Sequence, residues 1–171
     1  MSALLALLAL SAALCAGEIA LAPAPRLPLD VTHRAPGWAG PAAATGAGLL
    51  ALQIAAVAWR GELHPALPVA GAALMVAGAG LRLWAIRALG DCFRTEHELH
   101  RGQRLVRSGP YARCRHPSEV GLLAFALGAA ALMQSWPAAA IWAGVLLPAS
   151  AIRLRREEAL LQRAYGPGYT A

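Results

Sequence analysis

Long apolar runs alternate with short polar stretches along the 171 residues of this chain. The first run, residues 2–22, contains a single charged residue, Glu18. A helix over such a run crosses a hydrocarbon core of ~30 Å, because an α-helix rises ~1.5 Å per residue. Four further apolar runs follow, at 41–59, 66–86, 118–135 and 137–152. The pattern therefore predicts an all-α, polytopic membrane protein with five transmembrane helices.

The first run also has the length of a secretory signal peptide. It lacks a basic segment at its start, and a leucine stands immediately before Cys15, where cleavage requires a small residue. We therefore expect the run to be retained as a first transmembrane helix.

The polar stretches between the runs differ in length, and their lengths predict the topology. Residues 61–65 and 135–137 are short links, so we expect the last two spans to form a tight antiparallel hairpin. The longer stretches 23–40 and 87–117, together with a polar helix predicted for 153–165, then share the opposite face. Because arginine-rich segments stay on the inner side of a membrane, we expect this face to be cytoplasmic.

Composition agrees with a membrane protein. Hydrophobic residues make up 58% of the chain and charged residues 14%, with a mean hydropathy of +0.50. The net charge of +6 lies in arginines between apolar runs, so we expect membrane lipids as partners and no nucleic acid. Three cysteines without a CxxC pair predict neither a disulfide framework nor a structural zinc site. No repeat or domain boundary is apparent, so we expect one domain over residues 1–171.

The polar C-terminal helix carries its acids beside its apolar stripe. At 100° per residue, Glu158 shares a face with leucines and Glu157 flanks it, whereas Arg156 and Arg163 point away. A surface helix normally turns its acids to water, so this placement indicates a functional site. Pairing of the glutamates with neighbouring arginines such as Arg153 is the structural alternative.

A second polar block, RLVRSGPYARCRHPSEVG, covers residues 104–121. It contains GPY and then RHP, while the C-terminal helix carries RLRREEALLQRAYGPGY. In this order, with a helical hairpin between them, the two blocks resemble the isoprenylcysteine carboxyl methyltransferase family and its phospholipid methyltransferase relatives, over about residues 78–169. The resemblance implies an integral membrane enzyme that uses S-adenosylmethionine.

By this resemblance, the RHP and EE blocks close around the cofactor. The implied cofactor-binding residues are His116, Pro117, Glu157 and Glu158, with Gly109 and Tyr111 as nearby lining. The chemistry agrees, since carboxylates suit the ammonium and hydroxyl groups of S-adenosylmethionine, while Arg115 and a helix N-terminus suit its carboxylate. The structural alternatives are that His116 is only an interfacial cap and that Gly109 belongs only to a turn.

One position departs from the resembled family, in which an aromatic residue, commonly tyrosine, stands second after RHP. Here this residue is Glu119. A carboxylate there could accept a proton from a phenol or enol, which favours a hydroxyl-bearing lipid over a prenylcysteine. Two alternatives stay open: Glu119 pairs with Arg115 four residues earlier, or it is another cofactor contact. The predicted catalytic residues are Glu119, His116 and Arg115.

These features predict an S-adenosylmethionine-dependent methyltransferase, with O-methylation favoured. Its lipophilic acceptor would be an isoprenoid carboxylate or a phenolic or pyrone lipid hydroxyl. We expect no metal, because the HELH motif at 97–100 has no further ligand cluster. The absence of lysine and the wealth of alanine and arginine are typical of a high-GC bacterium, so we expect the bacterial inner (plasma) membrane. The alternative is a non-catalytic membrane protein, a lipid-binding or assembly subunit, which would not bind the cofactor.

Overall fold

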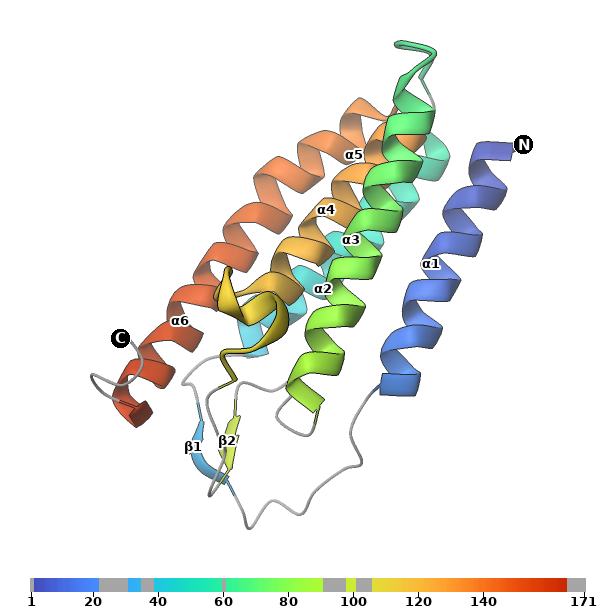
Figure 1. Ribbon diagram of the computed structural model, residues 1–171. Coiled ribbons are helices and arrows are strands. Elements are labelled where there is room, and N and C mark those ends of the chain that lie inside the picture. The colour runs from blue at the N-terminus through green and yellow to red at the C-terminus, as the bar shows by residue number, and fades with distance from the viewer. Residues whose placement is uncertain are drawn as a thin grey trace.

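Helices dominate the part of the chain that the computed structural model describes, which is residues 2–21, 31–34, 39–59, 61–90, 98–100 and 106–165 (Figure 1). The helical elements are α1 (Ser2–Leu21), α2 (Ala39–Ala58), α3 (Leu67–Leu89), η3 (Gly109–Ala112), α4 (Pro117–Leu132), α5 (Trp136–Ile141), η4 (Trp142–Leu146) and α6 (Leu147–Tyr165). The predicted helical class is confirmed.

A two-stranded antiparallel sheet adds to the helices. Its strands are β1 (Val31–Arg34) and β2 (Glu98–His100). It joins the two long polar stretches, for which the sequence predicted only loops. Strands of three and four residues are too short to produce a recognisable alternating pattern, and the sequence analysis therefore missed them.

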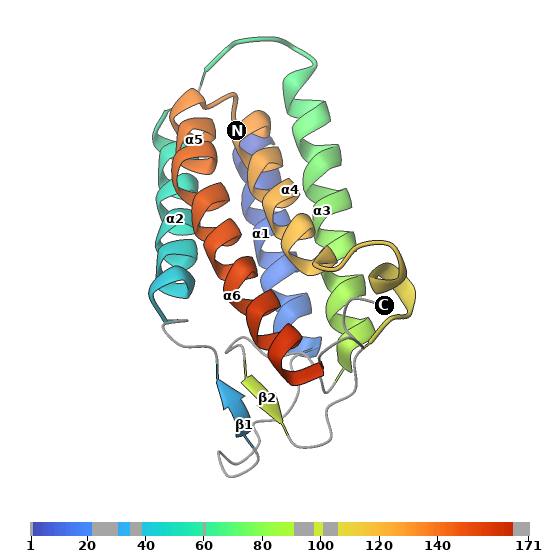
Figure 2. The ribbon, with the colours of Figure 1, turned by 90° about the vertical axis from the view of Figure 1, so that its left-hand side faces the viewer.

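The helices pack side by side as a bundle with α3 and α4 in extensive contact (Figure 2). α1 packs on α3, whereas α2 packs on α5, η4 and α6. Buried apolar side chains from these helices form one core, which includes Leu7, Leu14, Leu52, Met75, Phe125 and Leu146. All of these helices therefore share a single hydrophobic interior.

Glycines allow the backbones of α3 and α4 to touch. Gly78 of α3 lies against Gly121 of α4, and a Cβ built on Gly78 would lie 2.6 Å from the backbone nitrogen of Phe125. Gly71 and Gly128 repeat the same contact seven residues away along each helix. The seven-residue spacing keeps both glycine pairs on the contact face of an antiparallel pair.

The chain from Trp136 to Tyr165 forms one continuous helix built from α5, η4 and α6 (Figure 1). The sequence analysis predicted a span at 137–152 followed by a separate helix at 153–165, and this division is wrong. Pro148 has no N–H to donate, and the π-helical segment η4 ends two residues before it, at Leu146. A local π turn absorbs the missing hydrogen bond without ending the helix.

Three helical stretches are long and apolar enough to cross a membrane: Ala3–Leu21, Leu67–Leu89 and Trp136–Arg163. Two shorter apolar helices, Ala43–Ala58 and Pro117–Leu132, lie within α2 and α4. Length and composition therefore support three of the five predicted spans among the described residues. The spans at 41–59 and 118–135 stay predictions.

The two short links meet at one end of the bundle. The Gln134 side-chain oxygen accepts hydrogen bonds from the backbone N–H groups of Leu63, at 2.6 Å, and His64, at 2.8 Å. The backbone N–H of Gly61 donates to the Met133 carbonyl at 3.4 Å. At the opposite end, α1 and α3 end, α4 begins and α6 extends furthest (Figure 1). We call this opposite end the polar end.

The glycine contact predicts opposite outcomes for two substitutions in α3. Gly78→Ala forces a methyl group against the α4 backbone, and we expect it to lower the free energy of unfolding by about 1–3 kcal/mol. Gly80→Ala is the matched control, because nothing lies within 4 Å of a Cβ there. Since alanine is the better helix former, we expect the control to be neutral or stabilising by up to ~1 kcal/mol. Thermal unfolding in detergent measures both, and equal effects would contradict the backbone contact.

Candidate functional site

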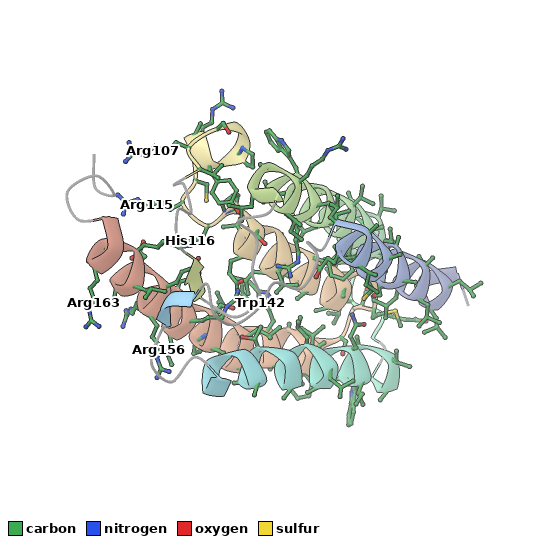
Figure 3. All side chains as sticks on the ribbon, turned by 90° about the horizontal axis from the view of Figure 1, so that it is seen from below. Arg107, Arg115, His116, Trp142, Arg156 and Arg163 are labelled. Atoms are coloured by element: carbon green, nitrogen blue, oxygen red, sulfur yellow. The ribbon has the colours of Figure 1, made fainter. Side chains whose placement is uncertain are left out.

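Ionisable side chains from four helices gather at the polar end, which Figure 3 views from below. They come from the last turns of α1, the C-terminal half of α3, the start of α4 and α6. The residues are Glu18, Arg82, Arg115, His116, Glu119, Arg153, Glu157 and Glu158. Each is paired with a side chain from a distant part of the sequence, so the polar end is a network of interhelical charge contacts.

His116 lies between the two acids of α6. Its Nε2 is 3.3 Å from Glu158 Oε1, and its Nδ1 is 3.9 Å from Glu157 Oε2. An ionised carboxylate can only accept a hydrogen bond, so the Nε2–H group donates in the shorter contact. His116 is the N-cap residue of α4, yet its side chain makes no capping hydrogen bond and is only 15% exposed. The His116 side chain therefore contacts the acids of α6 and does not cap α4.

α6 presents its acids to α4 as the helical periodicity predicted. Arg156 and Arg163 point away from the bundle (Figure 3). Arg115, which is more than half exposed, places its Nη1 3.8 Å from Glu158 Oε1. Glu158 consequently has an imidazole on one side and a guanidinium within electrostatic reach.

Glu119 lies one turn further along α4 and is 3% exposed. Its carboxylate forms an ion pair with the guanidinium of Arg153 on α6. Of the open alternatives, the pairing with Arg115 is not the one seen: the ion-pair partner of Glu119 is Arg153, whereas Arg115 lies near Glu158. The side chain of Arg153 reaches Glu119 from α6. The catalytic role of Glu119 stays a prediction.

Arg82 and Glu18 form a second ion pair, between α3 and α1. Arg82 Nη1 also donates to the Ser118 side-chain oxygen at 3.2 Å and to the Ser118 carbonyl at 3.3 Å. The sequence analysis did not single out this cluster. A charged residue alone in each of two apolar runs was the signal that could have found it.

The GPY part of the motif folds as η3 against the end of α3. Gly109 has a positive φ of 60°, a conformation that glycine adopts without strain, so the turn interpretation holds for this residue. Burial, and then the negative charge of Glu157, raises the pKa of Tyr111 above its ordinary value of 10.0, while the Arg82 charge opposes this. The phenol is therefore protonated at neutral pH and can donate a hydrogen bond.

The structure brings His116, Arg115, Glu157 and Glu158 together and places Tyr111 within electrostatic reach of Glu157. Pro117 is the buried first residue of α4. The HELH motif begins at a residue outside the described part of the chain, as does the GPGY turn. Within the described residues, no three His, Cys, Asp or Glu side chains are arranged to hold a metal ion.

The three acids of the cluster on α4 and α6 differ in their exposure to solvent, and exposure decides which of them a ligand can reach. The side chains of Glu157 and Glu158 are about one-third exposed, whereas Glu119 is enclosed and already paired with Arg153. A small organic cation can therefore reach the first two acids from the polar end. Their carboxylates fit the ammonium or ribose hydroxyl groups of S-adenosylmethionine, and the Tyr111 hydroxyl adds a nearby donor.

A family model described as phospholipid methyltransferase matches residues 67–168, which is more than half of the chain. The match covers α3, η3, α4 and the continuous helix from Trp136, and therefore includes the first motif block and all of the second except Tyr169. It confirms the resemblance inferred from those blocks. A search of curated proteins finds no match.

The buried ion pair predicts a large loss of stability when one partner is neutralised. Glu119→Gln removes the ion-pair partner of Arg153, although the Glu157 charge still acts on that guanidinium, and we expect the free energy of unfolding to fall by up to about 3 kcal/mol. The double variant Glu119→Leu/Arg153→Met should recover most of the loss, because it removes both charges and keeps apolar volume. Arg163→Gln, on the exposed face of α6, is the control and should change stability by no more than ~0.5 kcal/mol. Equal stability of the single and double variants in thermal unfolding would contradict the pairing.

The raised pKa of Tyr111 predicts a delayed alkaline titration. We expect Tyr111 to ionise well above pH ~10, measured as the difference in tyrosinate absorbance between the wild type and Tyr111→Phe. Above pH ~10 the unfolded phenol loses its proton while the folded one keeps it, so the contribution of Tyr111 to stability falls as pH rises. A difference spectrum that titrates at the ordinary pKa of tyrosine would show that the phenol is not buried.

Proposed function

We propose that this chain, which belongs to the phospholipid methyltransferase family of membrane methyltransferases, transfers the methyl group of S-adenosylmethionine to an oxygen atom of a lipophilic acceptor. The acceptor class is an isoprenoid carboxylate or a phenolic or pyrone lipid hydroxyl. The contact that carries the proposal is His116 to Glu158, 3.3 Å apart although 42 residues separate them in sequence. It joins the two motif blocks into one polar cluster beside apolar helices.

The accessible side chains have complementary roles toward the methyl donor. Glu157 and Glu158 would hold its ammonium group and ribose hydroxyls, and Arg115 would hold its carboxylate. His116 would orient the acids, and Gly109 and Tyr111 would line the same region, with the Tyr111 hydroxyl as a hydrogen-bond donor. Pro117 would start α4 beside them and leave backbone N–H groups of its first turn for an anion.

S-adenosylmethionine supplies a methyl group on a sulfonium, which an acceptor oxygen displaces in one step while the sulfur keeps the bonding electron pair. A carboxylate acceptor needs no base, whereas a hydroxyl acceptor must lose a proton. His116 is the better candidate for this proton among the predicted catalytic residues. Glu119 is a weak proton acceptor because it is enclosed and paired with Arg153, and we assign it to holding that guanidinium. The main catalytic contribution would be alignment of the two reactants away from water.

The arrangement of charge supports a membrane orientation. Exposed arginines at the polar end include Arg87, Arg107, Arg113, Arg115, Arg155, Arg156 and Arg163. Under the positive-inside rule they would place the polar end in the cytoplasm. We propose five spans in a bacterial plasma membrane, with the donor entering from the cytoplasm and the acceptor approaching laterally through the bilayer.

Binding of S-adenosylhomocysteine to the purified protein tests the donor assignment. We expect Glu158→Gln and His116→Ala each to weaken binding by about tenfold or more, because each removes a group from the accessible cluster. Glu62→Gln is the charge-matched control, since Glu62 is exposed in the link at the opposite end of the bundle. Absence of binding by the wild type would instead favour the non-catalytic lipid-binding or assembly subunit.

A second measurement identifies the chemical class of the methyl acceptor. Membranes that contain the protein are incubated with a radiolabelled methyl donor and extracted with organic solvent. Label in the lipid phase that resists base indicates an ether, base-labile label indicates an ester, and label that stays in protein overturns a free lipid acceptor.

A further inference from the structure

α1 lies outside the part of the chain that matches the family model, yet it contacts the polar cluster directly. The match begins at residue 67, whereas α1 ends at Leu21. Glu18, in its last turn, is the only charged residue of the helix. Its carboxylate pairs with Arg82, which lies inside the matched region.

The guanidinium of Arg82 donates hydrogen bonds to two different helices, α1 and α4. Its Nε and Nη2 both donate to the Glu18 carboxylate, the latter at 3.2 Å. Its Nη1 donates to the Oγ and the carbonyl oxygen of Ser118, at 3.2 and 3.3 Å. Arg82 therefore bridges α1 and the first turn of α4.

We infer that Glu18 is a positioning residue for the proposed methyl-transfer site and acts through Arg82 on the turn that carries His116. Ser118 is two residues beyond His116, and the first backbone hydrogen bond of α4 runs from the Val120 N–H to the His116 carbonyl at 3.1 Å. Since the His116 side chain does not cap the helix, Arg82 is a partner that fixes this turn from outside it.

The charges make this bridge dependent on Glu18. The Arg82 side chain is 12% exposed and lies in an apolar helix, where a guanidinium requires a counter-charge. Near Glu18, Gly17 of α1 lies against the side chain of Leu83 on α3, which would be 2.9 Å from a Cβ at Gly17. Without Glu18, the Arg82 side chain would move toward another acid or toward solvent and release Ser118.

The same guanidinium also acts on the GPY part of the motif block. Its charge acts on the Tyr111 phenol, against the larger effect of burial on that group. Two elements flank the proposed donor site, η3 and α4. Arg82 acts electrostatically on Tyr111 of η3 and donates hydrogen bonds to Ser118 of α4. This supports a positioning role for the Glu18–Arg82 pair over simple anchoring of α1.

α1 offers a matched control for anchoring alone. Ser11 Oγ accepts a hydrogen bond from the Gln53 side chain of α2 at 3.4 Å, about two helical turns from Glu18. Ser11→Ala therefore weakens a polar contact of α1 that does not involve α4.

The experiment compares Glu18→Gln, Ser11→Ala and the wild type as full-length protein in lipid nanodiscs, by amide hydrogen exchange and by titration with S-adenosylhomocysteine. For Glu18→Gln we expect exchange at the start of α4, residues 118–122, to rise by about tenfold and the affinity to fall by about tenfold. For Ser11→Ala we expect neither change. Ser118→Ala removes only one hydrogen bond of the bridge and should accelerate the same amides by about threefold, which keeps the inference testable if Glu18→Gln fails to fold.

The affinity readout rests on the proposed function, and the exchange readout does not. If the wild type binds no S-adenosylhomocysteine, the proposed function fails, and exchange at the start of α4 alone decides the positioning role. Unchanged exchange there in Glu18→Gln overturns the inference. An equal rise in exchange across all helices in Glu18→Gln and Ser11→Ala also overturns it, because α1 would then act only as a packing element.

Discussion

Backbone contact between α3 and α4 sets the geometry on which the polar end depends. No side chain separates the helices where Gly71 meets Gly128 and where Gly78 meets Gly121. A Cβ on Gly121 would lie 2.7 Å from the backbone nitrogen of Arg82. The Arg82 side chain therefore leaves its backbone beside the first turns of α4. Helices held apart by larger side chains could not make both the Arg82 to Ser118 contacts and the apolar core behind them.

Charged groups in an apolar bundle must be paired, and the polar end contains both close ion pairs and looser contacts. The enclosed Glu119 is ion-paired with Arg153, and the mostly buried Arg82 is ion-paired with Glu18. His116 makes looser contacts with the two acids of α6, at 3.3 and 3.9 Å, and these acids are about one-third exposed. Because desolvation is costly for the buried Glu119 and Arg82, their ion pairs with Arg153 and Glu18 are needed to hold the helices together. Glu157 and Glu158 are exposed enough for a ligand to reach them from solvent.

The polar cluster is built mainly on helices, which is the favourable arrangement for a site that must hold two reactants in register. The acids of α6 belong to a helix that runs without a break from the opposite end of the bundle. Trp142 fixes this helix to α4 by donating from its indole N–H to the Leu123 carbonyl at 2.9 Å. The position of Glu157 and Glu158 relative to His116 is thus set by packing along the helices.

The sequence by itself determined the features that depend on local periodicity and composition. The apolar runs predicted the helices, the 100° repeat placed Glu157 and Glu158 on the inner face and Arg156 on the outer one, and the two motif blocks indicated the family. Tertiary structure alone decided the partners of Glu119, Arg82 and Glu18, and the short sheet between two stretches expected to be loops. It also showed that Pro148 does not end the last helix. Side-chain pairs between helices depend on the register and distance of packed backbones, and that register is set by contacts such as those of the paired glycines, which no single helix encodes.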